Sequence, residues 1–103
     1  MRIVISLVLA VACANAPAEV TVGGTLHGSS LREWHAASAA NQLITAADIV
    51  EKVLNLRDPL AVAPKARAVQ SCINRVSNNF KLRSQMVTDT AVACMAELGY
   101  LPR

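Results

Sequence analysis

The first eighteen residues most constrain what this chain can fold into, because they decide how much of it remains to build a domain. Arg2 supplies a positive charge, residues 3–12 form an uncharged apolar run, and residues 16–18 (Ala-Pro-Ala) have the small-x-small pattern of a cleavage site. The apolar run is only about half as long as a membrane-spanning helix, which needs roughly twenty residues. The sequence therefore predicts a signal peptide over residues 1–18 that is removed on export.

Two other ways of processing the same segment stay open. Cys13 follows a short run of small and apolar residues, which resembles the lipoprotein box of bacteria, although Ala10 stands where that family prefers leucine. In that family the cysteine becomes the acylated first residue of the mature protein, so lipidation at Cys13 is one alternative. Cleavage after Ala16 is the other. All three routes predict an exported protein, periplasmic in a Gram-negative host and otherwise secreted.

The two cysteines that remain, Cys72 and Cys94, are the next constraint. An even pair in a short exported chain normally forms a disulfide. Closing a loop of about 23 residues should stabilise the fold by about 3 kcal/mol. That is a large share of what the core of so small a domain contributes. The two are not spaced as Cys-x-x-Cys, so we predict a structural disulfide and no redox activity.

Removal of residues 1–18 from the 103-residue chain leaves enough sequence for one domain with a modest core. Residues 19–29 contain three glycines and no clear periodicity, which predicts a flexible N-terminal arm or an irregular strand. Residues 30–103 carry helical signals throughout. We therefore predict an all-α fold for them, a small bundle of three to four helices.

The first helical segment is expected over residues 31–56. Ser30 and Glu33 fit a capping box at its start. Apolar or small residues then recur in three- and four-residue steps and define one helix face. These are Leu31, Trp34, Ala37, Ala40, Ile44, Ala47, Val50 and Leu54. A second cap-like sequence at residues 45–48 leaves open whether the segment is one helix, or two over 31–42 and 46–56 with a break near 41–45.

Two further helices are expected over residues 64–79 and 85–98. Pro64 suits a first helical position, where its missing amide costs nothing, and residues 60–63 then form a linker. The apolar face of the first helix ends at Phe80, Ser84 is expected to cap the second helix, and Gly99 to end it. The pair would form an αα-hairpin pinned by the disulfide, with Trp34 packed near that bond as the one large core aromatic.

Catalytic, phosphate-binding and metal-binding motifs are mostly absent from the sequence. It holds no phosphate-binding glycine loop, Gly-x-Ser-x-Gly elbow or His-Glu-x-x-His motif. His27 and His35 are its two histidines and have too few potential partners for a zinc site, and His35 is expected to point away from the apolar face. Asp48 and Lys52 have the spacing of an ordinary surface ion pair. We expect no catalytic residue, no metal ion, no cofactor and no enzymatic activity.

The distribution of charge gives the one candidate binding surface. The chain has ten basic and seven acidic residues, and without Arg2 of the predicted signal peptide the balance is mildly positive, which does not suit nucleic-acid binding. All charged residues between positions 59 and 88 are basic. We predict a basic face for an anionic envelope component or an acidic protein. Its candidate residues are Arg67, Arg75, Lys81 and Arg83.

In layout, though not in motif, the chain resembles two kinds of small helical periplasmic protein. One is the acid-stress chaperones, which have a signal peptide and one disulfide between helices. The other is the immunity proteins that neutralise cell-wall amidases from neighbouring bacteria. The likeness covers architecture only, and architecture does not imply function. Because catalytic motifs are lacking, we expect a non-enzymatic protein that binds a partner in the cell envelope, as a chaperone, an inhibitor or an immunity-type factor. The alternative is a structural lipoprotein held on the membrane through Cys13.

Overall fold

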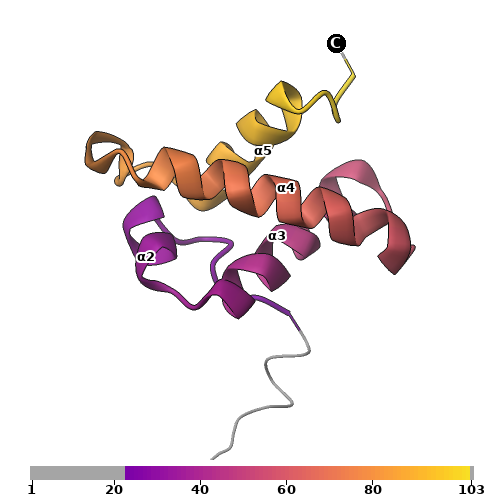
Figure 1. Cartoon of the computed structure of the whole chain (residues 1–103), viewed down its shortest axis with the longest axis horizontal. Helices are drawn as coiled ribbons and strands as arrows, with labels where there is room; N and C mark the ends of the chain where they lie inside the picture. Colours follow the sequence, from indigo (N-terminus) through magenta and orange to yellow (C-terminus); the bar gives the residue numbers. More distant parts are fainter. Residues whose placement is uncertain (1–22, 103) are drawn as a thin grey trace, which may run out of the picture.

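The computed structural model describes residues 23–102, which form four α-helices, one 3-10 helix and no strand (Figure 1). In chain order these are α2 (Leu31–Ala36), α3 (Ala39–Leu54), α4 (Pro59–Ser77), the 3-10 helix η2 (Phe80–Leu82) and α5 (Val87–Glu97). The central element is α4, against which α2, α3 and α5 all pack. The helical fold is thus confirmed. The predicted signal peptide and Cys13 lie outside the described residues.

The first helical segment is broken, which the sequence had left open, and the break lies at residues 37–38 and not near 41–45. Ala37 and Ser38 are extended, and Ser38 Oγ accepts a hydrogen bond from the Asn41 amide at 3.1 Å, which makes Ser38 the N-cap of α3. Thr45 lies inside α3 instead of capping a helix. It is fully buried, and its Oγ1 accepts the Leu26 amide at 3.3 Å. The capping box of Ser30 and Glu33 is present as predicted.

The break changes which face of α3 is buried. Two extended residues interrupt the helical phase, so only part of the predicted stripe is buried beyond Ala37. Val50 is fully buried and Leu54 packs against the core, as predicted. The buried residues of α3 are Gln42, Thr45, Ala46, Ile49 and Val50. Of the predicted stripe, Ala40 is exposed, whereas Ile44 and Ala47 are half-buried. The consequence is an apolar strip on α3 that the core does not fully cover.

Helix α4 begins five residues earlier than predicted. Asp58 is its N-cap, with Oδ1 accepting the Leu60 amide at 3.0 Å, and Pro59 is its first residue. Pro59 therefore takes the role that was assigned to Pro64, and residues 60–63 are helical and not a linker. Pro64 lies inside the helix, where it cannot donate to the carbonyl of Leu60. Both residues are exposed, so water can reach that carbonyl.

Helix α5 begins without the predicted serine cap. Its N-cap position is Met86, and no side chain caps it. Instead, the Val87 amide donates to the Ser29 carbonyl and the Leu31 amide to the Gln85 carbonyl, both at 2.8 Å, in an antiparallel bridge between the residues before α2 and those before α5. At the other end Gly99 terminates the helix as predicted. Its φ is +80°, and the Tyr100 amide donates to the Met95 carbonyl.

The described part of the predicted arm, residues 23–29, is packed against α3. Leu26 is buried in the core. Three successive backbone amides donate to α3 side chains: Gly24 to Asp48, Thr25 to Asn41 and Leu26 to Thr45. The polar side chains that interrupt the apolar pattern of α3 therefore stabilise the fold. They accept hydrogen bonds from backbone amides of a segment that has no secondary structure of its own.

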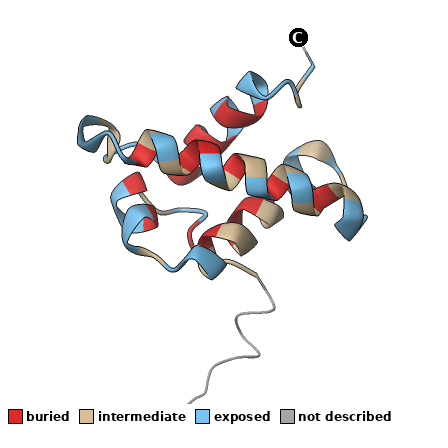
Figure 2. Cartoon of the chain, viewed as in Figure 1, coloured by how far each residue is buried: buried red, intermediate tan, exposed pale blue. Residues whose placement is uncertain are grey.

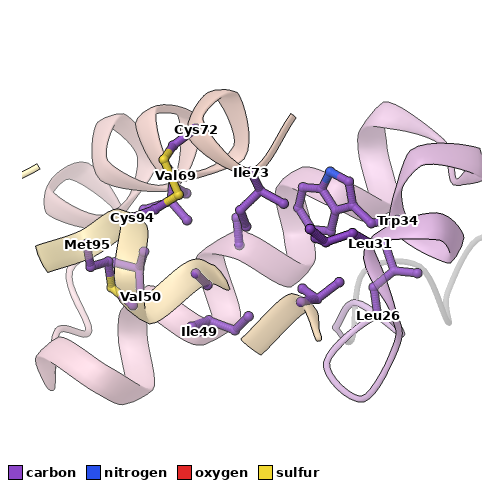
Figure 3. Packing of buried hydrophobic residues seen from close by; sticks show 14 of the residues in the cluster. Leu26, Leu31, Trp34, Ile49, Val50, Val69, Cys72, Ile73, Cys94 and Met95 are labelled. Atoms are coloured by element: carbon purple, nitrogen blue, oxygen red, sulfur yellow. A yellow bond between two sulfur atoms is a disulfide. The ribbon is translucent and has the colours of Figure 1, made fainter. Parts of the chain in front are cut away.

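The core runs along α4 and contains the disulfide (Figures 2 and 3). Cys72 of α4 and Cys94 of α5 are bonded, with their Cα atoms 6.0 Å apart, which confirms the predicted pairing. Trp34 is fully buried, and its indole Nε1 donates to Asn74 Oδ1 at 2.8 Å. Figure 3 shows Ile73 between the indole and the disulfide, so Trp34 fills a separate part of the core and does not lie beside the bond as predicted.

Replacement of Gly24 by alanine should destabilise the fold by about 2 kcal/mol, because a Cβ there has no space. It would lie 2.6 Å from Thr45 Cα, and backbone cannot yield as the end of a flexible side chain can. Denaturant unfolding followed by circular dichroism measures the change. Gly28→Ala is the matched control, since a Cβ at Gly28 meets no atom within 4 Å. Equal stability of the two variants would contradict the close packing of the arm on α3.

Candidate functional site

The one salt bridge among residues 23–102 joins the arm to α3. His27 Nε2 lies 3.1 Å from Asp48 Oδ2, and the same oxygen accepts the Gly24 amide at 2.9 Å. The predicted pair of Asp48 and Lys52 is therefore replaced by a contact with His27. Because Asp48 binds both ends of the segment 24–27, its role in the fold is to hold that segment on α3.

An open hollow of about 840 Å³ adjoins this salt bridge, between the arm, the C-terminal half of α3 and the start of α5. Its charged lining includes carboxylates and cations alike, Glu51 and Lys52 among them. The Thr88 hydroxyl donates to the His27 carbonyl, so it braces the arm. In the described part of the chain the His27 ring has no hydrogen-bond partner besides Asp48, and no serine or threonine is placed as a nucleophile beside it.

His35 is exposed, as predicted, with Nδ1 3.5 Å from Ser77 Oγ. Within residues 23–102 no three His, Cys, Asp or Glu side chains come close enough together to hold a metal ion. Glu33 and Asp58 serve in helix caps, and Asp48 pairs with His27. The stronger candidate for a site is apolar.

That candidate is a groove of about 320 Å³ between α3 and the first half of α4, which we call the α3–α4 groove. Val62 and Ala66 of α4 form its buried floor. The walls are half-buried apolar side chains: Leu43, Ile44 and Ala47 on α3, and Ala63 on α4. Charged side chains stand at its edges. Asp48 and Glu51 belong to α3, and Arg67 to α4.

The α3–α4 groove follows from two features of the sequence. Small residues at Ala47, Ala63 and Ala66 leave space between the two helices. The break at residues 37–38 then turns the face of α3 so that Ile44 is only half-buried. Sequence reasoning missed the groove because it placed Ile44 and Ala47 in the core. The available signal was the adjacent pair Leu43-Ile44, since a helix with one narrow buried face cannot bury two neighbours equally.

The four residues of the predicted basic face lie on α4, on η2 and directly after η2. Arg67 stands at the edge of the groove, and Arg75 follows eight residues later on α4, about 12 Å along the axis. Lys81 is exposed on η2. Arg83 is half-buried, and its Nε donates to the Ser77 carbonyl at 2.9 Å. Arg83 thus satisfies a carbonyl at the C-terminal end of α4, where a positive charge is favourable.

Comparison of the chain with protein-family models, with curated proteins and with solved structures found no match. No helix in the described residues is both long enough and apolar enough to cross a membrane. What the protein does is therefore inferred from the surfaces of its own fold.

Proposed function

We propose that this protein is an exported, non-enzymatic binding protein of the cell envelope, which holds an apolar helical segment of another envelope protein in the α3–α4 groove. The observation that carries the proposal is the groove itself: a buried floor of Val62 and Ala66, apolar walls, and opposite charges on its two edges. Grooves between helices commonly take an amphipathic helix whose anchors recur every three or four residues.

The edge charges specify what such a partner helix should carry. Glu51 stands on the α3 side and Arg67 on the α4 side. A matching helix has a basic residue on one flank of its apolar stripe and an acidic residue on the other, which fixes its orientation. The volume of about 320 Å³ has room for one or two large anchor side chains. Among the three roles considered, this narrow and polarised groove favours an inhibitor or immunity-type factor over a chaperone with broad specificity.

Export rests on two observations. The disulfide between Cys72 and Cys94 is typical of an oxidising compartment. Residues 1–18 have the pattern of a signal peptide. We propose a periplasmic location in a Gram-negative host and secretion otherwise. Lipidation at Cys13 is the alternative, in which the protein would partition into detergent and lose that property on Cys13→Ser.

A variant that fills the groove should lose the partner. Ala63→Trp places an indole between α3 and α4, so a tagged form of this variant should retain at least about tenfold less partner from an extract of the host envelope, as expected for loss of one buried anchor. Ala93→Trp is the matched control, because Ala93 is exposed on α5 and does not line the groove. The wild type and the control should retain one stoichiometric protein.

A charge test refines the same experiment. Arg67→Glu should weaken retention because it reverses the α4 edge of the groove, whereas Arg75→Glu, farther along α4, should leave retention unchanged. Circular dichroism must show that every variant stays helical. Retention of the same protein by Ala63→Trp at the wild-type level would overturn the groove as the binding site. Equal loss with Ala93→Trp would do so as well.

A further inference from the structure

The turn between α4 and α5 exposes a large aromatic ring. Phe80, the only phenylalanine of the chain, is 73% exposed on η2. The other two aromatic side chains are covered, since Trp34 is buried and Tyr100 is half-buried beneath Lys65 Nζ, 4.2 Å from its ring centroid. The sequence pattern placed Phe80 at the end of the apolar face of α4, but α4 ends at Ser77 and leaves the ring outside the core.

This turn, residues 78–86, is held by hydrogen bonds at both ends, and we call it the Phe80 loop. Asn79 Oδ1 accepts the Lys81 amide at 3.1 Å, which caps η2. Arg83 Nε donates to the Ser77 carbonyl, and the Arg83 carbonyl accepts the Arg32 amide at 3.0 Å. The Phe80 ring is thus held on a turn that hydrogen bonds already fix, so the binding of a ligand there costs little conformational entropy.

Basic residues lie on the Phe80 loop and on the two helices beside it, α4 and α2. Lys81 is next to Phe80 and exposed, Arg75 is exposed in the last turn of α4, and the Arg83 carbonyl holds the Arg32 backbone beside the loop. Figure 1 shows the loop at the end of α4, next to α2. The carboxylates on the adjoining helices are Glu33 of α2, and Asp89 and Glu97 of α5, of which Glu97 lies at the far end of its helix. Glu33 is turned back onto the Ser30 amide at 2.8 Å, and Asp89 lies in the first turn of α5.

We propose that the Phe80 loop docks on an anionic lipid surface, with the Phe80 ring in the headgroup region and Lys81, Arg75 and Arg32 beside the lipid phosphates. One ring with a few cations presents far less than the roughly 800 Å² per partner that a stable protein interface buries. A lipid surface needs no such area, because an inserted aromatic and juxtamembrane cations act together to give weak, reversible binding. The surface lies beyond the end of α4, away from the α3–α4 groove, and does not depend on it.

The test places a reporter at the ring in the protein as recovered from the host envelope. Phe80→Trp is compared with Leu60→Trp, whose site is 85% exposed at the other end of α4 beside Asp58. Trp34 is buried and contributes the same background to both. The probes are phosphatidylcholine vesicles with and without phosphatidylglycerol, each containing brominated lipid that quenches an inserted indole.

We expect quenching of Phe80→Trp, and not of Leu60→Trp, on the vesicles with phosphatidylglycerol only. Adding Lys81→Glu should lower the partition coefficient at least about tenfold, and added salt should lower it further. Absence of quenching would overturn the proposal, and so would equal quenching of both variants or on both vesicle types. If Phe80→Ala loses the protein retained from the envelope extract while vesicles leave Phe80→Trp unquenched, the loop is a protein contact and the lipid proposal is wrong.

Discussion

Replacement of Trp34 by alanine is expected to lower the free energy of unfolding by about 4 kcal/mol. Trp34 is fully buried, so its removal leaves a cavity that α2 and α4 can close only in part. It also removes the indole donor from Asn74 Oδ1, which then stays part-buried without that hydrogen bond. Urea unfolding followed by circular dichroism measures the change. The loss is a large fraction of the stability of a small domain.

Trp34→Phe separates the two contributions and remains informative if the alanine variant does not fold. It keeps an aromatic ring in the core but cannot donate to Asn74, so a loss of about 1–2 kcal/mol is expected. A loss below about 1 kcal/mol on Trp34→Ala would contradict the central place of the indole in the core.

Removal of the disulfide is the second large effect. The double variant Cys72→Ala/Cys94→Ala should lower the free energy of unfolding by about 3 kcal/mol. The bond joins two residues that are 22 positions apart in the sequence, and so it reduces the conformational entropy of the unfolded chain. Both positions are buried, and alanine avoids placing a hydroxyl there. For a domain of this size the midpoint of thermal unfolding should fall by on the order of 15 °C.

Reductant provides the matched control for this result. It should lower the thermal midpoint of the wild type to about that of the double variant, and leave the double variant unchanged. If the oxidised wild type and the double variant unfold at the same temperature, the bond contributes nothing to stability. The domain would then depend on its core alone.

Some of the predictions that depend on only a few neighbouring residues are confirmed. The capping box of Ser30 and Glu33 is one of them, and the left-handed Gly99 at the end of α5 is another. The pairing of Cys72 with Cys94 followed from there being only two cysteines after the predicted signal peptide. Each of these depends little on the rest of the fold.

Helix starts that depend on distant contacts were predicted wrongly. Ser38 and Thr45 both suit an N-cap, and the amide of Leu26 in the arm engages Thr45 inside α3. The start of α5 is satisfied by the Ser29 carbonyl, about sixty residues earlier in the chain. The start of α4 had a local signal, Asp58 directly before Pro59, which competed with the equally plausible Pro64.

The candidate sites could be predicted only in part, because they depend on the phase of α3 and on where α4 ends. A pattern of charges suggested one basic face, but Arg83 is used to satisfy the end of α4 and Arg67 stands apart at the groove. Phe80 was expected in the core and is exposed, since α4 ends three residues before it. Periodicity alone does not show where a helix ends.

We propose that a trimmed, disulfide-linked domain binds an envelope protein through the α3–α4 groove. The most direct test is to incorporate a photo-reactive amino acid at Ala63 in the host, illuminate intact cells, and measure the intact mass of the adduct before and after reduction. We expect an adduct in which residues 19–103, with Cys72 and Cys94 paired, are covalently joined to one protein, and no such adduct from the same probe at Ala93. An identical adduct from both positions, or none from Ala63, would contradict it.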